Sequence, residues 1–306
     1  PTEIIFTSGG TEANNLALQG VLRATKVAHP HVITTSIEHK SVLDVLHYLE
    51  KSSIIELTLL NVDKYGLIDK YDIEKHIQDN TVLVSSMYVN NEIGVVQNIR
   101  DIGKTLEGIN EKRKGLVLPR IFFHTDAVQA FPYLPVNVQS LHGDILSMSG
   151  HKIYGPKGSG FLYVKSTTPF SPILFGGGQE FGYRAGTENV LGIVGLGYAV
   201  RLLAQKKAHH IKRISLLAEY MRSQLVQKTG ACLTLSDHVA PHIIHVFFEG
   251  SDGETLLMNL DLAGIAASHG SACTSGSLTV SHVLRACGYT SEQARGSIRF
   301  SIGKHT

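Results

Sequence analysis

Short apolar, β-branched runs alternate with longer amphipathic stretches through the first two thirds of the 306-residue chain. This alternation predicts the strands and helices of an α/β sheet. The candidate strands are Val32–Ser36, Val82–Met87, Ile121–His124, Ile145–Met148 and Gly160–Val164. In open α/β sheets ligands lie outside the carboxyl ends of the strands, so we expect a site built from the polar residues that follow these strands.

The pattern changes after about Ala208. Apolar residues at helical spacing from Ile211 to Leu225 predict an amphipathic helix, and a strand-like run follows at Ile243–Phe248. The chain is long enough to bury one large core and a smaller one. We therefore predict a large domain over residues 1–208 and a small domain over residues 209–306.

Composition and charge narrow the class of protein. With 43% hydrophobic and 18% charged residues the chain reads as an ordinary globular protein. A formal charge of +2 gives no reason to expect a nucleic acid or a membrane surface as partner, so a small-molecule substrate is the better expectation. No apolar run approaches the roughly 20 residues that a membrane-spanning helix needs.

Cysteine usage favours a reducing compartment. The three cysteines, Cys232, Cys273 and Cys287, have no CxxC spacing, which argues against a disulfide framework or a thiolate metal site. We therefore expect a cytoplasmic protein. A mitochondrial location stays open, because Pro1 leads straight into an apolar run and the N-terminal segment looks incomplete.

A glycine-containing turn follows the first apolar run. The segment Ser8–Asn15 comes after Ile4–Phe6 and precedes Leu16–Leu18, so it places a glycine turn at the start of a helix. Free backbone N–H groups and a hydroxyl could bind an anion there, and an ordinary capped turn explains the pattern equally well. The spacing differs from GxGxxG and GxxxxGK[ST], so neither a dinucleotide nor an ATP site is predicted.

Three titratable side chains stand at the predicted strand exits. Lys152 follows a buried-looking strand on a tight turn, where a desolvated lysine can form a Schiff base, although most lysines are solvated surface residues. Asp126 follows an apolar strand and needs a partner, either a protonated pyridine nitrogen or a structural ion pair or helix cap. His39 could stack on a flat cofactor or move a proton, though most histidines do neither.

A run of small residues surrounds one of the cysteines. Residues 267–277 are almost all Ala, Ser, Gly or Thr, which predicts a mobile, exposed loop with Cys273 at its centre. An accessible thiol there could reach a substrate and then a second partner, and an incidental loop cysteine is the plain alternative. Cys232 and Cys287 lie in apolar patterns and are expected to be buried.

Three histidines have the spacing of metal ligands only superficially. They are His238, His242 and His245. No carboxylate or thiol completes the set, so we interpret them as structural and predict no metal site.

Taken together, these segments resemble the NifS-like cysteine desulfurases of the class V aminotransferase group, whose close relatives include the selenocysteine lyases. The similarity runs from Ile4 to Gly303. Ser8–Glu12 resembles the family's phosphate turn, Val89–Gly94 its cofactor-side asparagine motif, and Ser149–Lys152 its Schiff-base motif. These motifs occur in the family's order.

Three further segments extend the resemblance. Residues 176–180 with 184–187 resemble the loop that donates a phosphate contact across the dimer interface of this family, which implies a homodimer. Residues 271–275 resemble the long, flexible cysteine arm of the housekeeping subgroup. Residues 297–301 resemble the strand whose arginine, here Arg299, binds the substrate carboxylate.

The resemblance implies a PLP-dependent transferase of fold type I, with a mixed, mostly parallel sheet in the large domain and a smaller α+β C-terminal domain. Lys152 would hold pyridoxal 5'-phosphate (PLP), Asp126 would bond its pyridine nitrogen, and Gln129 its phenolic oxygen. His39 would stack on the ring, and Asn91 and Arg299 would orient the substrate. The phosphate would be bound by Thr11, Ser149 and His151, together with Thr187 of the partner subunit, and Gly10 would also be a cofactor-binding residue.

The implied activity is cysteine desulfuration, in which L-cysteine gives L-alanine. Lys152 or His39 would take the Cα proton, and the sulfur would remain as a persulfide on Cys273 for transfer to an acceptor protein in iron–sulfur cluster assembly or thio-modification. The alternatives are a selenocysteine lyase, a PLP transaminase, or an inactive scaffold subunit of the same fold. Family members extend beyond Pro1 and Thr306, so both ends of this chain are expected to be incomplete.

Overall fold

The computed structural model describes residues 1–234, 238–269 and 280–306, which fall into two compact units. The first unit comprises Pro1–Leu60, Asp69–Tyr88 and Gln97–Gln205, and the second comprises Asn61–Ile68, Val89–Val96 and Lys206–Thr306. The boundary expected at residues 208/209 lies beside the last of these junctions. The sequence did not reveal the two earlier segments of the second unit, which are joined to it by long-range pairing such as the β-bridge between Val95 and Val239.

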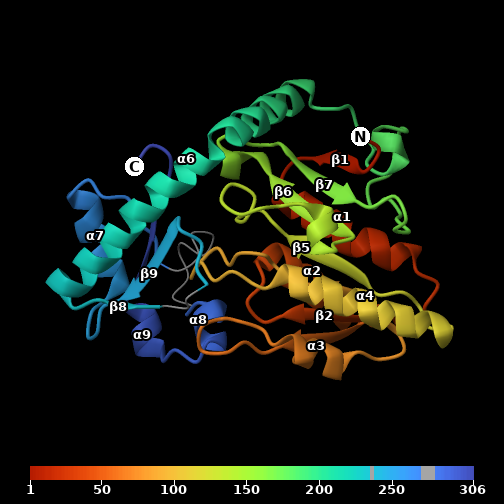
Figure 1. Cartoon of the computed structure of the whole chain (residues 1–306), viewed down its shortest axis with the longest axis horizontal. Helices are drawn as coiled ribbons and strands as arrows, with labels where there is room; N and C mark the ends of the chain where they lie inside the picture. Colours follow the sequence, from red (N-terminus) through yellow and green to blue (C-terminus); the bar gives the residue numbers. More distant parts are fainter. Residues whose placement is uncertain (235–237, 270–279) are drawn as a thin grey trace. The chain divides into compact units, whose positions relative to one another are not determined.

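The first unit is built around a seven-stranded sheet in the order β1-β7-β6-β5-β4-β2-β3 (Figure 1). Its strands are β1 (Ile4–Thr7), β2 (His31–Thr35), β3 (Glu56–Leu60), β4 (Thr81–Ser85), β5 (Phe122–Asp126), β6 (Ile145–Ser149) and β7 (Gly160–Val164). All neighbours are parallel except β7, which is antiparallel to both β6 and β1. β1 therefore runs in the same direction as β6, and the mixed, mostly parallel sheet expected from the sequence is confirmed.

This topology brings the carboxyl ends of β1, β2, β4, β5 and β6 to one edge of the sheet. Each of the five strands expected from the sequence is present, with small differences at the ends. Strand β3 was not expected, because it is half exposed and carries Glu56 and Thr58 among its apolar residues. The edge that collects the strand exits is the one on which a ligand site is expected.

The first unit also contains several helices. They are α1 (Gly10–Ala24), α2 (Lys40–Lys51), α3 (Lys70–His76), α4 (Ile99–Gly115), α5 (Val138–Leu141) and the first part of α6 (Val190–Thr229), with short 3-10 turns η1 (Gly150–Ile153) and η2 (Glu180–Gly182). Helix α1 lies against β4 to β7 through buried residues such as Leu16, Ala17 and Val21. None of the helices in the described ranges is long and apolar enough to span a membrane.

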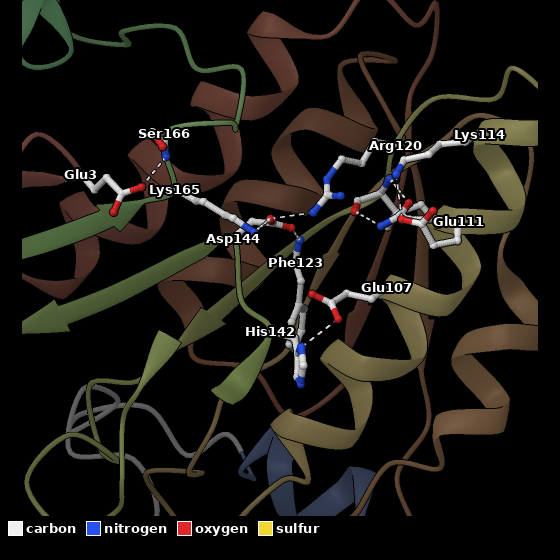
Figure 2. A network of polar contacts seen from close by, with 12 residues as sticks. Glu3, Glu107, Glu111, Lys114, Arg120, Phe123, His142, Asp144, Lys165 and Ser166 are labelled. Carbon is white, nitrogen blue, oxygen red and sulfur yellow. Dashed lines mark hydrogen bonds and ion pairs between the residues drawn. The ribbon is translucent and has the colours of Figure 1, made fainter. Parts of the chain in front are cut away.

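A network of polar contacts lies at the opposite edge of the sheet, next to the residue that precedes β6 (Figure 2). Asp144 is buried, and its Oδ1 atom accepts from Arg120 Nη2 at 2.9 Å. Its Oδ2 atom accepts from Phe123 N at 3.0 Å, and Lys165 Nζ lies 4.0 Å from Oδ1. This carboxylate therefore joins β5, the start of β6 and the end of β7, and its charge is balanced by side chains of the same unit.

The second unit contains a three-stranded antiparallel sheet in the order β10-β9-β8. Its elements are β8 (Cys232–Leu233), β9 (Ile243–Phe247), β10 (Ser297–Ser301), α7 (Gly253–Leu262), α8 (His282–Ala286), α9 (Ser291–Arg295) and the rest of α6. Burial raises the pKa of the Cys287 thiol to about 12, as fits a packing residue. The expectation that Cys232 is buried was wrong, because it lies on a two-residue edge strand that leaves it exposed.

Candidate active site

The glycine turn after β1 lies against two other strand exits. Gly9 has φ +149°, which favours glycine, and a Cβ atom on Gly160 would lie 2.8 Å from Gly9 Cα. A Cβ atom on Gly10 would lie 3.0 Å from Val128 Cγ2 and 3.5 Å from Ser149 Cβ. The turn therefore touches the exits of both β5 and β6, and only small residues fit there.

Helix α1 begins at this turn without a side-chain cap. The first N–H groups of an α-helix have no partner within the helix, so they are available to an anion. Thr11 is exposed in this first turn. The phosphate-binding alternative is thereby favoured over the ordinary capped turn that the sequence left open.

The exit of β6 adds further polar groups. Ser149 is buried, and its hydroxyl lies 2.9 Å from His151 Nδ1. Burial lowers the pKa of His151, and the positive charges of Lys152 and Lys157 lower it further. Lys152 lies exposed in η1, which is held by a hydrogen bond from Gly150 N to Ser159 O at 2.8 Å. The turn thus places the Lys152 amine close enough to His151 to influence its pKa.

Asp126 is the last residue of β5, and its carboxylate is buried. Oδ1 accepts from Val128 N at 2.9 Å, and Oδ2 accepts from Asn14 Nδ2 at 2.7 Å. In the described part of the chain no lysine, arginine or histidine forms an ion pair with it. A buried carboxylate without a cation suits a protonated ring nitrogen of a bound group.

His39 caps the N-terminus of α2. Its Nδ1 atom accepts from Ser41 N at 3.1 Å and lies 2.8 Å from Ser41 Oγ. Ser41 Oγ in turn accepts from Asn14 Nδ2 at 2.8 Å. The predicted residues His39 and Asp126 are thus linked through two side chains, Asn14 and Ser41, to which the sequence interpretation gave no role.

Asn14 could have been found from the sequence. It lies on the buried face of α1 among apolar residues such as Ala13, Ala17 and Leu18. A polar side chain on the apolar face of a helix must find buried partners, and that requirement is visible in the spacing alone. Ser41 gives no comparable signal, because its importance depends on the turn that His39 caps.

A buried carboxyl group lies beside these residues. Glu38 follows β2 and accepts from Thr35 Oγ1 and Met87 N, both at 2.8 Å. Burial raises its pKa to about 8, despite these two hydrogen bonds, and the negative charge of Asp126 raises it further. At neutral pH this raised pKa favours the protonated form of Glu38.

The loop of residues 176–187 is tied to the start of the chain. Arg184 Nε donates to Glu12 Oε1 at 2.7 Å, and Phe6 N donates to Glu180 Oε2 at 3.1 Å. Burial alone would raise the pKa of Glu12, but hydrogen bonds from Arg184 and Ser8 outweigh burial and lower it. Thr187 is exposed and lines a pocket together with Ser8.

Two predicted substrate-binding residues meet within the second unit. Arg299 Nη1 donates to the main-chain oxygen of Asn91 at 2.7 Å, and Arg299 also pairs with Ser268 through the backbone. The neighbouring Asn90 is fully buried and accepts from the N–H groups of Glu92 and of the next residue. Asn90 therefore shapes the turn, while Asn91 stays partly exposed.

The remaining predicted residues are placed less directly. Gln129 follows Val128 in the turn after β5 and is partly exposed. His245 is buried against Thr234, with Nδ1 2.7 Å from the hydroxyl, and burial lowers its pKa to about 3. Cys273 lies outside the described residues.

Comparison with known proteins places this site in a family. The model of the family described as "Aminotransferase class-V" matches residues 1–306. The chain belongs to the class-V aminotransferase family. Among its relatives, "Cysteine desulfurase IscS" of Dictyoglomus turgidum is 43% identical over 307 residues, covering 99% of this chain and 75% of the relative. "Putative cysteine desulfurase IscS 1" of Bacillus subtilis is 44% identical over 305 residues, covering 98% and 77%.

Solved structures give the same result for this class-V aminotransferase. One titled "NIFS-LIKE PROTEIN" has a TM-score of 0.90 and 33% identity, covering 100% of this chain and 78% of its own. A NifS-like protein from Rickettsia africae has a TM-score of 0.84 and 31% identity, covering 98% and 76%. The NifS-like resemblance and PLP fold type I expected from the sequence are confirmed.

Class-V aminotransferases of this kind are PLP-dependent enzymes, so the expected cofactor and enzyme class are confirmed. The residues at the carboxyl edge of the sheet fit PLP. The uncapped start of α1 with Ser149 and His151 suits a phosphate, and the buried Asp126 lacks a cation that a ring nitrogen would supply.

Proposed function

We propose that this class-V aminotransferase is a cysteine desulfurase, which removes sulfur from L-cysteine and releases L-alanine. The observation that carries the proposal is the similarity of 42–44% identity, over nearly the whole chain, to curated relatives named cysteine desulfurase. The grouping of polar residues at the sheet edge supports it, because each chemical part of PLP has a fitting side chain there.

In this proposal the first unit binds the cofactor. Lys152 holds PLP, Asp126 faces its ring nitrogen, and Gln129 bonds the phenolic oxygen. The phosphate is bound by Gly10, Thr11, Ser149 and His151, with Thr187 of the partner subunit. When bound, PLP supplies an electron-accepting ring that makes bonds at the substrate Cα atom easier to break.

The chain's own residues orient the substrate and move its protons. Arg299 binds the substrate carboxylate, for which a planar guanidinium is well shaped, and Asn91 helps to align the amino acid. Lys152 or His39 accepts the Cα proton, because an amine and an imidazole both exchange protons near neutral pH when suitably placed.

The sulfur is transferred to the thiol of Cys273. The Cys273 thiolate attacks the substrate sulfur, an S–S bond forms as the substrate C–S bond breaks, and the substrate carbon takes a proton to give alanine. The persulfide then passes to an acceptor protein, such as an iron–sulfur scaffold or a thiolation protein. This chemistry requires a reduced thiol, so we also propose a reducing compartment such as the cytoplasm.

A homodimer belongs to the proposal. Several large apolar side chains at the start of α6 and in the preceding loop are exposed, among them Leu191 at 88% and Phe175 at 74%. Several exposed large apolar side chains in one part of the chain favour a subunit interface. Light scattering of the purified protein should give twice the mass of the chain, and a monomer at micromolar concentration would contradict this part.

The proposed function is tested with the purified protein, PLP and L-cysteine. We expect a yellow protein that releases alanine and forms one persulfide per chain. Lys152→Ala should abolish covalent cofactor attachment and lower alanine formation by at least about 10³-fold, because the covalent anchor and a proton acceptor are lost together. If the Lys152→Ala variant formed alanine at the normal rate, the assignment of Lys152 as the covalent anchor of PLP would be wrong.

Substitution of each cysteine separates the roles of the thiols. Cys273→Ala should keep the cofactor absorbance and lose the persulfide, while Cys232→Ala and Cys287→Ala serve as matched controls that keep it. Turnover of selenocysteine but not of cysteine would instead identify a selenocysteine lyase. A protein that remains colourless with added PLP would indicate an inactive scaffold.

A further inference from the structure

The side chain of Asn14 connects two parts of the candidate site. It is buried on α1, and its Nδ2 atom donates to Asp126 Oδ2 at 2.7 Å and to Ser41 Oγ at 2.8 Å. An amide nitrogen carries two hydrogens, so both are used in these bonds. Asn14 therefore joins the exit of β5 to the start of α2.

The direction of the next hydrogen bond follows from this arrangement. Because Ser41 Oγ accepts from Asn14, its own hydrogen is available for His39 Nδ1, 2.8 Å away. The N–H group of Ser41 points at the same Nδ1 atom, at 3.1 Å. A main-chain N–H can only donate, so Nδ1 must be an acceptor.

The tautomer of His39 is thereby set. In a neutral imidazole one nitrogen donates and the other accepts, so a ring that accepts at Nδ1 carries its hydrogen on Nε2. A hydrogen on Nδ1 would face the Ser41 N–H group and would break the bond that this group donates. The ring nitrogen left for other partners is Nε2, and it acts there as a donor.

We propose that Asn14 and Ser41 are positioning residues that hold His39 in its Nε2–H tautomer and tie its ring to the Asp126 carboxylate. This inference rests on the proposed function, in which His39 and Asp126 both face the cofactor. The neutral His39 ring then has no acceptor nitrogen for the substrate Cα proton. That proton goes to Lys152, and His39 serves as a hydrogen-bond donor.

Ser41→Ala tests the connection with little change in volume. It removes the hydroxyl and leaves the Asn14–Asp126 hydrogen bond and the Ser41 N–H group in place. Nitrogen-15 NMR of the histidine rings, assigned with a His39→Gln variant, should show only the Nε2–H form in the wild type. In Ser41→Ala only the longer main-chain N–H bond at 3.1 Å still favours the Nε2–H form. The Nδ1–H form should therefore become detectable beside it, and kcat should fall about 3- to 10-fold with KM nearly unchanged.

Two other variants sharpen the test. Ser41→Thr keeps a hydroxyl and should restore the single tautomer and most of kcat. Asn14→Ala removes both bonds at once, so we expect the tautomer mixture together with PLP binding weakened by about 10-fold, because Asp126 Oδ2 loses its donor. A general loss of stability would not by itself change the His39 tautomer or weaken PLP binding, so these two measurements separate a positioning role from a purely structural one.

Ser85→Ala is the matched control. Ser85 Oγ lies 2.8 Å from Nδ1 of another buried histidine, His124, whose ring also contacts Ser147 Oγ at 3.0 Å. This variant removes the same chemical bond in the same unit, outside the proposed connection. It should lower the unfolding temperature much as Ser41→Ala does, while the His39 tautomer and kcat stay as in the wild type.

The outcomes separate this inference from the proposed function. If Ser41→Ala and Asn14→Ala both keep the pure Nε2–H signal of His39, the positioning role is overturned, whatever their activity. If the wild type fails to turn over cysteine but His39 shows the Nε2–H tautomer that is lost in Ser41→Ala, the proposed function fails and the positioning of the ring stands.

Discussion

Two buried aspartates at opposite edges of the same sheet have different surroundings. Asp144, just before β6, accepts from Arg120 and Phe123 N and has Lys165 nearby (Figure 2). Asp126, at the end of β5, accepts from Asn14 and Val128 N but forms no ion pair with a side chain in the described ranges. Both side chains are buried, so the difference lies in how their charge is balanced.

The comparison separates a structural carboxylate from one adapted to a ligand. A buried charge needs a partner, and the unit itself supplies one to Asp144. At Asp126 the neighbouring groups orient the carboxylate without neutralising it, which suits a cation that arrives with the cofactor. The charge at the amino edge of the sheet is thus balanced by residues of the chain, whereas in the proposed function PLP would balance the charge at the carboxyl edge.

The largest expected effect is the loss of catalytic rate in the Asp126→Asn variant. In the proposed function Asp126 faces the ring nitrogen of PLP, so removing its negative charge should lower kcat by about 10²–10³-fold, because the cofactor would accept electrons less well. The free energy of unfolding of the cofactor-free protein should fall by about 1–2 kcal/mol, because asparagine has one acceptor oxygen and one of the two donors, Asn14 Nδ2 or Val128 N, loses its bond. Steady-state kinetics and urea unfolding check the two parts, and near-normal kcat would contradict the assignment.

The second effect concerns Glu38, the protonated neighbour of Asp126. Its folded-state pKa of about 8 lies above the ordinary value of 4.5, so between these pH values the folded chain keeps a proton that the unfolded chain loses. Stability contributed by this group is therefore complete below pH 4.5 and lost as the pH rises towards 8, by about 1.4 kcal/mol per pH unit.

Glu38→Gln should remove that slope, because glutamine keeps an acceptor oxygen for Thr35 and Met87 N without titrating. Urea unfolding of the cofactor-free protein at pH 5, 6, 7 and 8 measures it. Glu74→Gln, at an exposed position on α3, is the control that should leave the slope unchanged. Equal slopes in the wild type and Glu38→Gln would show that Glu38 is ionised in the folded state.

The smallest effect is expected at the other edge. Asp144→Asn should lower the free energy of unfolding by about 1–2 kcal/mol, a modest value because Arg120 is 39% exposed and partly solvated. The rate of alanine formation should stay within about twofold of the wild type, because Asp144 lies away from the strand exits. A large loss of kcat in the fully folded variant would remove the distinction between the two aspartates.

Much of the fold was readable from the sequence, because it depends on local pattern. The buried strands β2, β4, β5 and β6 are continuous apolar runs, and the polar residues after them were correctly singled out as strand exits. The half-exposed β3 and the edge position of Cys232 were missed, because both depend on which neighbour a strand finds. Pairing is a property of the whole sheet and not of a short window.

In the candidate site, too, some residues could be predicted from the sequence and others could not. Lys152, Asp126 and His39 were predicted from their type and position, since each follows the end of a predicted strand. Ser41 and Glu38 were given no role, because their importance arises from contacts between segments far apart in the chain, such as Glu38 with Met87 N. Residue type can suggest a chemical role, but a positioning role exists only in three dimensions.

The division of the chain into two units has a practical consequence for dissecting the protein. The chain passes from one unit to the other after Leu60, Ile68, Tyr88, Val96 and Gln205. No single cut therefore yields either unit whole, and a fragment starting at Lys206 would lack both earlier segments. Neither unit can be removed or exchanged as one continuous stretch of sequence. We therefore expect that deleting the residues of one unit would also disturb the folding of the other.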